Sequence, residues 1–256
     1  MTIPEIQRMK GEKKITALTC YDFQMAKILD KAGVDIVLVG DSLGMVVLGY
    51  ENTLPVTMEE MLHHLKAVKR GIKNALLVGD MPFMSYKVDI KDSVYNAGRM
   101  TKEGGASAVK LEGGIEIIPT IKAMLDADIP VMGHIGLRPQ AIHKMGGYKV
   151  QRDEGLIEEA KALEEAGIFS LVLECIPGSL AKKITESLKI PTIGIGSGIY
   201  CDGQILVLND IIGLTERSPK FVRRYLNMKD EISNAIERFI EDVSKGDFPK
   251  KEESYE

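Results

Sequence analysis

Five ionisable side chains stand at the ends of separate, mostly apolar segments of this 256-residue sequence. These residues are Asp41, Asp80, Glu112, His134 and Glu174. An acidic residue just after a strand often caps the next helix, and that explanation is sufficient for a single aspartate. It does not explain five such endings, because charge is tolerated inside a protein only when it is paired or bound to another group. We therefore expect these side chains to converge on one functional site.

The carboxylates of Asp41, Asp80 and Glu112 offer only oxygen ligands. Oxygen ligands without cysteine or histidine suit Mg2+ or Mn2+ better than zinc or copper. Mg2+ keeps open coordination positions, so it can chelate the carboxylate and keto oxygens of a 2-oxo acid. Such chelation stabilises the enolate that forms when the adjacent carbon loses its proton. The sequence thus predicts that these three residues form a metal site that supports enolate chemistry.

Three further residues extend the predicted site. Lys110 lies two positions before Glu112, and because side chains alternate along a strand, both point to the same side. Lys110 can offset the charge of a substrate carboxylate, and Ser42 can donate a hydrogen bond to it. Glu174 follows an apolar segment, where burial would raise its pKa towards that of a useful general base.

Eight short apolar segments alternate with helical patterns and are typical of parallel strands covered on both faces. This alternation favours a (β/α)8 barrel, in which the carboxyl ends of the strands form the mouth of the active site. The expected strands are Ile15–Cys20, Asp35–Gly40, Ala75–Gly79, Ser107–Leu111, Pro130–Gly133, Ser170–Leu173, Thr192–Ile195 and Gln204–Leu208.

The helical segments carry capping signals and apolar stripes. Thr57 to Glu60 form a capping box, one later stripe ends near Gly167, and a long final helix ends at Gly246. No low-complexity linker interrupts the pattern. We therefore predict a single α/β domain over residues 1–256, with a short N-terminal extension and a charged, frayed C-terminal tail over residues 250–256.

Composition excludes several classes of partner. A net charge of −4 gives no reason to expect nucleic acid or an anionic membrane. No apolar run approaches the roughly 20 residues that cross a bilayer, and the N-terminus lacks the apolar region of a secretory signal. Cys20, Cys175 and Cys201 show no metal-binding spacing and indicate a reducing compartment. These features predict a cytoplasmic protein.

Motifs along nearly the whole chain resemble those of the ketopantoate hydroxymethyltransferase family, which is also called the 3-methyl-2-oxobutanoate hydroxymethyltransferase family. Each motif is weak alone, but their order and spacing are specific. They are Leu18–Asp22, Val39–Gly44, Asn52–Thr57, Gly79–Phe83, Val109–Gly114, Gly133–Gln140, Gly146–Gln151, Leu173–Cys175, Ile193–Gly198 and Asp202–Val207.

The resemblance implies a (β/α)8-barrel enzyme that transfers a one-carbon unit from 5,10-methylenetetrahydrofolate to 3-methyl-2-oxobutanoate, giving 2-dehydropantoate on the route to pantothenate and coenzyme A. It implies one Mg2+ per subunit and assembly as a homodecamer. The residues that it places at the site are Asp41, Asp80 and Glu112 as magnesium ligands, Asp41, Ser42, Asp80, Lys110 and His134 as oxo-acid contacts, and Glu174 as proton acceptor.

Some positions depart from the family's common pattern, namely Tyr50, Asn209 and the pair Arg152-Asp153. They concern the outer pocket, so no residues are assigned to folate. One rival interpretation is a Mg2+-dependent C–C lyase or mutase of the phosphoenolpyruvate mutase and isocitrate lyase type. Isocitrate-lyase-like members carry a catalytic cysteine in a basic loop, whereas the comparable loop here, Lys144–Gly147, has none. Another rival is a barrel that serves only as a scaffold, which gives no reason to retain Lys110 and Glu174 together.

Overall fold

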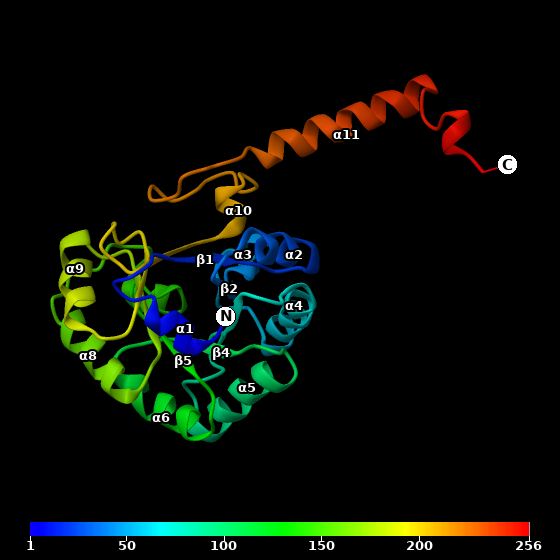
Figure 1. The fold of residues 1–256 in the computed structure, drawn as a ribbon. Coiled ribbons are helices and arrows are strands. Elements are labelled where there is room, and N and C mark those ends of the chain that lie inside the picture. Colours follow the sequence, from blue (N-terminus) through cyan, green and yellow to red (C-terminus); the bar gives the residue numbers. More distant parts are fainter. Residues whose placement is uncertain (256) are drawn as a thin grey trace. The chain divides into compact units, whose positions relative to one another are not determined.

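The computed structural model describes residues 1–255 and contains a closed barrel of eight parallel strands in sequence order (Figure 1). Every strand expected from the sequence overlaps an observed one, with ends displaced by at most three residues, so the predicted (β/α)8 fold is confirmed. The strands are β1 Ile15–Thr19, β2 Ile36–Val39, β3 Leu76–Asp80, β4 Ala108–Glu112, β5 Val131–Gly136, β6 Ser170–Glu174, β7 Thr192–Ile195 and β8 Gly203–Leu206.

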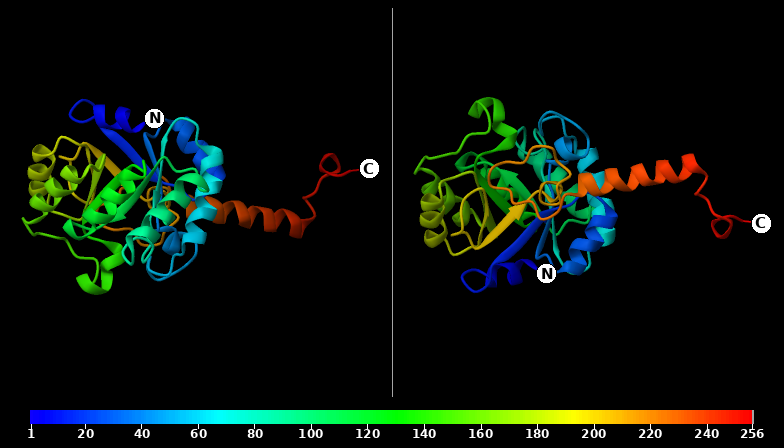
Figure 2. Two further views of the ribbon diagram at one scale, coloured as in Figure 1. Left: turned by 90° about the horizontal axis from the view of Figure 1, so that it is seen from below. Right: turned by 90° about the horizontal axis from the view of Figure 1, so that it is seen from above.

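Helices surround the strands, as Figures 1 and 2 show. The six longer ones, α2, α4, α5, α6, α8 and α9, form the outer layer, while the short α3, α7, η1 and η2 lie in the loops after strands. Their bounds are α1 Ile3–Arg8, α2 Phe23–Ala32, α3 Leu43–Val46, α4 Met58–Gly71, α5 Ile90–Lys102, η1 Ile115–Ile117, α6 Ile118–Asp126, η2 Pro139–Ala141, α7 Ile142–Met145, α8 Leu156–Ala166 and α9 Gly178–Ser187.

Alternate side chains of the strands fill the interior of the barrel. Leu76 and Val78 of β3 and Ala108 of β4 are 1% exposed or less and belong to one apolar cluster. Ile6 of α1 belongs to the same cluster, so α1 closes the end at which the strands begin. Because side chains alternate with a period of two, the next inward position on β3 is Asp80. The apolar core therefore leads directly to polar side chains at the carboxyl ends of the strands.

The predicted capping signals determine where helices begin and end. Thr57 and Glu60 form the reciprocal capping box at the start of α4. Gly167 ends α8 in the left-handed conformation, with φ of 104°, which glycine adopts at little cost. Cys20 and Cys201 are buried free thiols, and Cys175 is a partly buried one.

The chain divides into two compact units, one covering residues 1–207 and a second beginning at Leu208. All eight strands lie in the first unit, whereas the sequence predicted one domain throughout. The second unit contains α10 Leu208–Ile211, α11 Met228–Lys245 and η3 Lys251–Glu253. The predicted final helix is α11, and Gly246 caps it as expected. Its apolar stripe does not enter a core, because Ile236, Phe239 and Ile240 are each more than half exposed.

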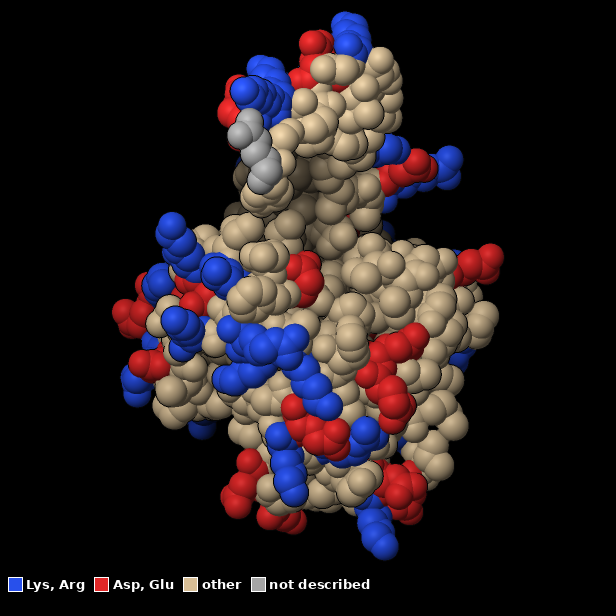
Figure 3. All heavy atoms as spheres, turned by 90° about the vertical axis from the view of Figure 1, so that its right-hand side faces the viewer, with Lys and Arg blue, Asp and Glu red and all other residues tan. Residues whose placement is uncertain are grey.

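Charged side chains of both signs are interspersed on the face drawn in Figure 3. Charges also pair within and between neighbouring helices: Arg99 of α5 contacts Glu59 of α4 at 3.1 Å and Glu103 at 2.9 Å. Exposed pairs of this kind contribute about 0–1 kcal/mol each. Within residues 1–255, no helix is long and apolar enough to span a membrane.

Candidate active site

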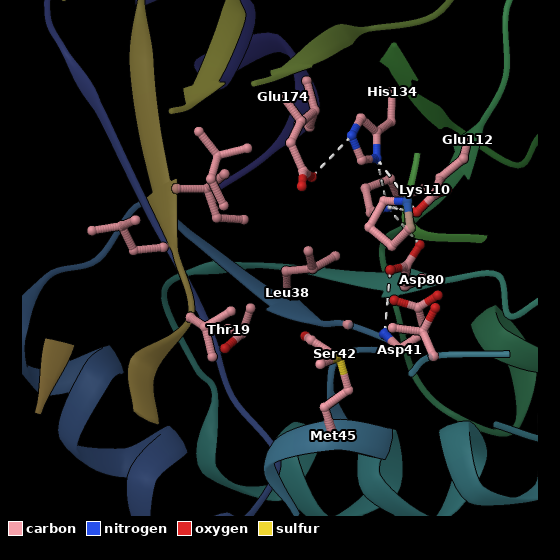
Figure 4. A pocket seen from close by; sticks show the side chains of 18 of the residues that line it. Thr19, Leu38, Asp41, Ser42, Met45, Asp80, Lys110, Glu112, His134 and Glu174 are labelled. Atoms are coloured by element: carbon pink, nitrogen blue, oxygen red, sulfur yellow. Dashed lines mark hydrogen bonds and ion pairs between the residues drawn. The ribbon is translucent and has the colours of Figure 1, made fainter. Parts of the chain in front are cut away.

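A cavity of about 140 Å³, partly open to solvent, lies at the carboxyl ends of the strands. All seven residues predicted for the site line it, although they come from five different strand ends: Asp41, Ser42, Asp80, Lys110, Glu112, His134 and Glu174. Figure 4 shows that the polar side chains of β3, β4 and β5 lie together, with Leu38 and Thr19 on the other side. Leu38, Val172 and Ile195 belong to the apolar lining. The cavity thus has a polar and an apolar side.

Lys110 lies at the centre of the polar side. Its ammonium is 2.8 Å from Asp80 Oδ1, 3.8 Å from Glu112 Oε1 and 3.2 Å from His134 Nδ1. Burial alone would lower the pKa of Lys110, but the charges of Asp80, Glu112 and Asp41 outweigh burial and raise it. Lys110 therefore remains a cation, and the predicted placement of Lys110 and Glu112 on the same side of β4 is confirmed.

His134 is neutral in this environment. Burial and the neighbouring charge of Lys110 lower the pKa of His134 to about 4. Because the ammonium of Lys110 can only donate, Nδ1 of His134 accepts and the ring proton lies on Nε2. Nε2 is 3.2 Å from Glu174 Oε2, although it makes no well-aligned hydrogen bond. His134 thus carries an N–H that faces the carboxylate of Glu174 (Figure 4).

Glu174 has the properties of a general base. Burial raises the pKa of Glu174 to about 7, while the charge of Lys110 acts in the opposite direction. Its backbone is held at the junction of β5 and β6, where the Glu174 carbonyl accepts a 2.8 Å hydrogen bond from Leu137. Gly136 is necessary at this junction, because its φ is 92° and a Cβ there would lie 2.3 Å from the Glu174 carbonyl oxygen.

Asp41 and Ser42 follow β2 on the neighbouring side of the cavity. The backbone N–H of Asp41 donates to Asp80 Oδ2 at 3.3 Å, and this hydrogen bond joins the ends of the adjacent strands β2 and β3. Burial raises the pKa of Asp41 well above its ordinary value, and the charges of Asp80 and Glu112 raise it further. Ser42 Oγ is 2.8 Å from the hydroxyl of Tyr21, a buried residue that the sequence analysis did not assign to the site.

Two further buried residues that sequence reasoning missed, Gln140 and Tyr86, contact these carboxylates. Gln140 Nε2 donates to Asp41 Oδ2 at 2.9 Å, and its backbone N–H donates to Glu112 Oε2 at 3.1 Å. The Tyr86 hydroxyl is 2.7 Å from Gln140 Oε1. The available signal for Gln140 was its place at the end of the motif Gly133–Gln140. Nothing in the sequence placed Tyr86 beside it.

The donor set is compatible with a divalent cation. Three carboxylates and one ammonium leave an excess of negative charge when all are ionised, and the buried oxygen Glu112 Oε1 accepts no hydrogen bond. Among residues 1–255, however, no three His, Cys, Asp or Glu side chains are already arranged to hold a metal. At this site the ammonium of Lys110 contacts both Asp80 and Glu112.

Comparison with known proteins decides the family. The profile of the family described as ketopantoate hydroxymethyltransferase matches residues 1–251. The chain is 55% identical to the 3-methyl-2-oxobutanoate hydroxymethyltransferase of Geobacter metallireducens over 99% of this chain and 98% of that protein. A Clostridium botulinum protein of the same name is 56% identical over 99% of this chain and 95% of that protein. The chain belongs to the ketopantoate hydroxymethyltransferase family. It is therefore an enzyme, as predicted.

Solved structures place this ketopantoate hydroxymethyltransferase family member in a wider fold group. A phosphonopyruvate hydrolase aligns with a TM-score of 0.62 at 15% identity, covering 99% of this chain and 93% of that one. A 2,3-dimethylmalate lyase of the phosphoenolpyruvate mutase and isocitrate lyase superfamily gives 0.61 at 14% identity, covering 98% and 91%. The rival family thus shares this fold, and the family match over residues 1–251 is what separates the two interpretations.

Proposed function

We propose that this enzyme transfers a hydroxymethyl group from 5,10-methylenetetrahydrofolate to 3-methyl-2-oxobutanoate and forms 2-dehydropantoate, a precursor of pantothenate and coenzyme A. The single observation that carries the chemistry is the largely buried Glu174. Its carboxyl group lines the same cavity as the cationic and acidic groups of the polar side, but it is not paired with any of the three carboxylates there. Such an arrangement separates a proton acceptor from the groups that hold a negatively charged substrate.

The two sides of the cavity match the two ends of a branched 2-oxo acid. On the polar side, Lys110 offsets the charge of the substrate carboxylate and Ser42 donates to it, with His134 beside them. On the apolar side, Leu38 and Val172 contact the branched carbon chain. This orientation brings C3 of the substrate towards Glu174, which lies at the border between the two sides.

Glu174 removes the C3 proton in this proposal. Its raised pKa makes the carboxylate basic enough for the task while leaving about half of it ionised near neutral pH. The Nε2–H of His134 faces Oε2 of Glu174 and orients the carboxylate. The electron pair of the broken C–H bond forms the enolate and then the new bond from C3 to the folate-derived methylene carbon. Both bonds from that carbon to N5 and N10 of the folate break, and one water supplies its hydroxyl group. The second proton of the water and the proton taken from C3 are transferred to N5 and N10, and tetrahydrofolate is released.

Asp41, Asp80 and Glu112 would together bind one Mg2+ per subunit. The chemistry that Mg2+ supplies when bound is polarisation of the keto oxygen, which lowers the cost of forming negative charge there. The excess of carboxylates over cations and the buried Glu112 Oε1, which accepts no hydrogen bond, support this assignment. When Mg2+ is bound, Asp80 would interact with both the metal and the ammonium of Lys110.

Exchange of the C3 proton of 3-methyl-2-oxobutanoate in D2O tests the proposal. We expect Mg2+-dependent exchange without folate, and formation of 2-dehydropantoate only when methylenetetrahydrofolate is added. Metal-independent exchange would contradict the proposed role of the acidic set. Cleavage of a 2,3-dialkylmalate in place of hydroxymethyl transfer would instead favour the lyase interpretation.

We also propose that the enzyme is a cytoplasmic homodecamer. The observation that supports assembly lies in α11, where five apolar side chains of one stripe are each at least 43% exposed: Ile232, Ile236, Phe239, Ile240 and Val243. A stripe of this kind marks an interaction surface. Sedimentation velocity should give the mass of ten chains, and a monomer at micromolar concentration would refute this part of the proposal.

A further inference from the structure

Gln140 uses every hydrogen-bonding group of its amide inside the protein, and only 4% of the residue is exposed. It lies in η2, in the loop after β5, and its side chain and backbone contact the carboxylates of the site. Nε2 donates to Asp41 Oδ2 at 2.9 Å and to the Met81 carbonyl at 2.9 Å, while Oε1 faces the Tyr86 hydroxyl at 2.7 Å.

The neighbours of Gln140 determine which way its amide points. A backbone carbonyl can only accept, so the NH2 group must face Met81 O. Oε1 then faces the hydroxyl of Tyr86, which lies 2.7 Å from Oε1 and 3.0 Å from the Glu112 carbonyl oxygen and can donate its one proton to either. The same hydroxyl accepts the backbone N–H of Glu112 at 3.1 Å. Tyr86 is 1% exposed, so water does not replace it in this network. The orientation of the amide is thus fixed by the Met81 carbonyl, which can only accept, and the Tyr86 hydroxyl lies against Oε1.

Gln140 also contacts one oxygen of each of two carboxylates. Its side-chain Nε2 donates to Asp41 Oδ2, and its backbone N–H donates to Glu112 Oε2. The other oxygen of Glu112, Oε1, makes no hydrogen bond and lies 3.8 Å from Lys110 on the side of the cavity. One oxygen of Glu112 is therefore anchored to the protein while the other remains available at the site.

We propose that Gln140, held by Tyr86, is a positioning residue that sets the carboxylates of Asp41 and Glu112 for binding of a divalent cation. This inference rests on the proposed function, because it assumes that these carboxylates serve a metal. Groups that orient metal ligands through hydrogen bonds typically change metal affinity by about 10–100-fold when they are removed. Neither Gln140 nor Tyr86 is proposed to touch the substrate.

Titration of the metal-free protein with Mn2+, followed by the electron paramagnetic resonance signal of free Mn2+, tests the proposal without turnover. Gln140→Met keeps the length of the side chain and removes its side-chain hydrogen bonds, including the one to Asp41, while the backbone N–H still donates to Glu112. We expect its dissociation constant for Mn2+ to rise about 10–100-fold. Tyr86→Phe removes the hydroxyl that lies against Gln140 Oε1, and we expect a smaller rise of about 2–10-fold. Ser85→Ala is the matched control.

Ser85 is buried next to Tyr86 and loses a comparable hydrogen bond, 2.7 Å long, to the Pro82 carbonyl, but it contacts no carboxylate. We expect Ser85→Ala to lower the melting temperature while Mn2+ affinity stays within about twofold of wild type. A folded Gln140→Met protein with wild-type affinity overturns the inference. Where that variant does not fold, Tyr86→Phe affinity equal to that of Ser85→Ala overturns it. Wild-type protein that binds no Mn2+ refutes the proposed metal site itself, and this inference with it.

Discussion

Replacement of Glu174 by glutamine should stabilise the protein at alkaline pH and abolish its proton-transfer chemistry. Glutamine keeps the volume of the side chain but cannot ionise. Wild-type Glu174 has a pKa of about 7 in the folded protein, compared with 4.5 in the unfolded chain, because burial disfavours its charge. The variant therefore removes the cost of ionising a buried carboxyl group.

The sign and size of the effect follow from these two pKa values. Between pH 4.5 and 7 the unfolded chain has released the proton that the folded protein still holds, so wild-type stability falls as the pH rises through this range and the full penalty applies above pH 7. A difference of about 2.5 pKa units at about 1.4 kcal/mol each gives roughly 3 kcal/mol. The side chain is 15% exposed, so little of this penalty is lost to solvent screening.

Urea unfolding of the metal-free protein at pH 5 and pH 8 measures this effect. The gain in the free energy of unfolding on Glu174→Gln should be larger by about 2–3 kcal/mol at pH 8 than at pH 5. Glu165→Gln, at an exposed position of α8, is the control and should show no such dependence. The same difference for Glu174→Gln at both pH values would refute the raised pKa. Full C3 proton exchange by the variant would refute the role of Glu174 as base.

Three further expectations follow from the geometry of the site. The rate of wild-type C3 exchange should rise about tenfold from pH 6 to pH 8, with a midpoint near 7, because only ionised Glu174 accepts the proton; a flat profile would contradict this. Lys110→Met should destabilise the metal-free protein by about 3–5 kcal/mol, because it leaves Asp80 and a second buried carboxylate without their cation. Thermal unfolding measures this loss, and added Mg2+ should recover part of it. Gly136→Ala should lower both the melting temperature and the exchange rate, since its Cβ meets the Glu174 carbonyl. Gly147→Ala, at φ of 110° in open space, should cost only the backbone strain of about 1–3 kcal/mol.

The sequence was sufficient to predict the barrel and the polar side of its cavity because both follow from the period of two along a strand. Asp80 continues the inward positions of Leu76 and Val78, so an ionisable residue at that position must enter the site once the strand is recognised. The same rule placed Lys110 and Glu112 on one side of β4. These side chains are defined by their own strand, and no knowledge of distant contacts is needed to place them.

Two other features depend on contacts that periodicity does not describe. The apolar stripe of α11 has the pattern of a core helix, yet Phe239 is 55% exposed, because amphipathic spacing specifies a face but not what covers it.

Gln140 illustrates the second case. It lies four residues after the end of β5, yet its side chain contacts Asp41, which is 99 positions away in the sequence. Tyr86 contacts the same side-chain amide. Strand ends therefore indicate which groups perform the chemistry, whereas the residues that orient those groups emerge only when the loops between the strands are packed together.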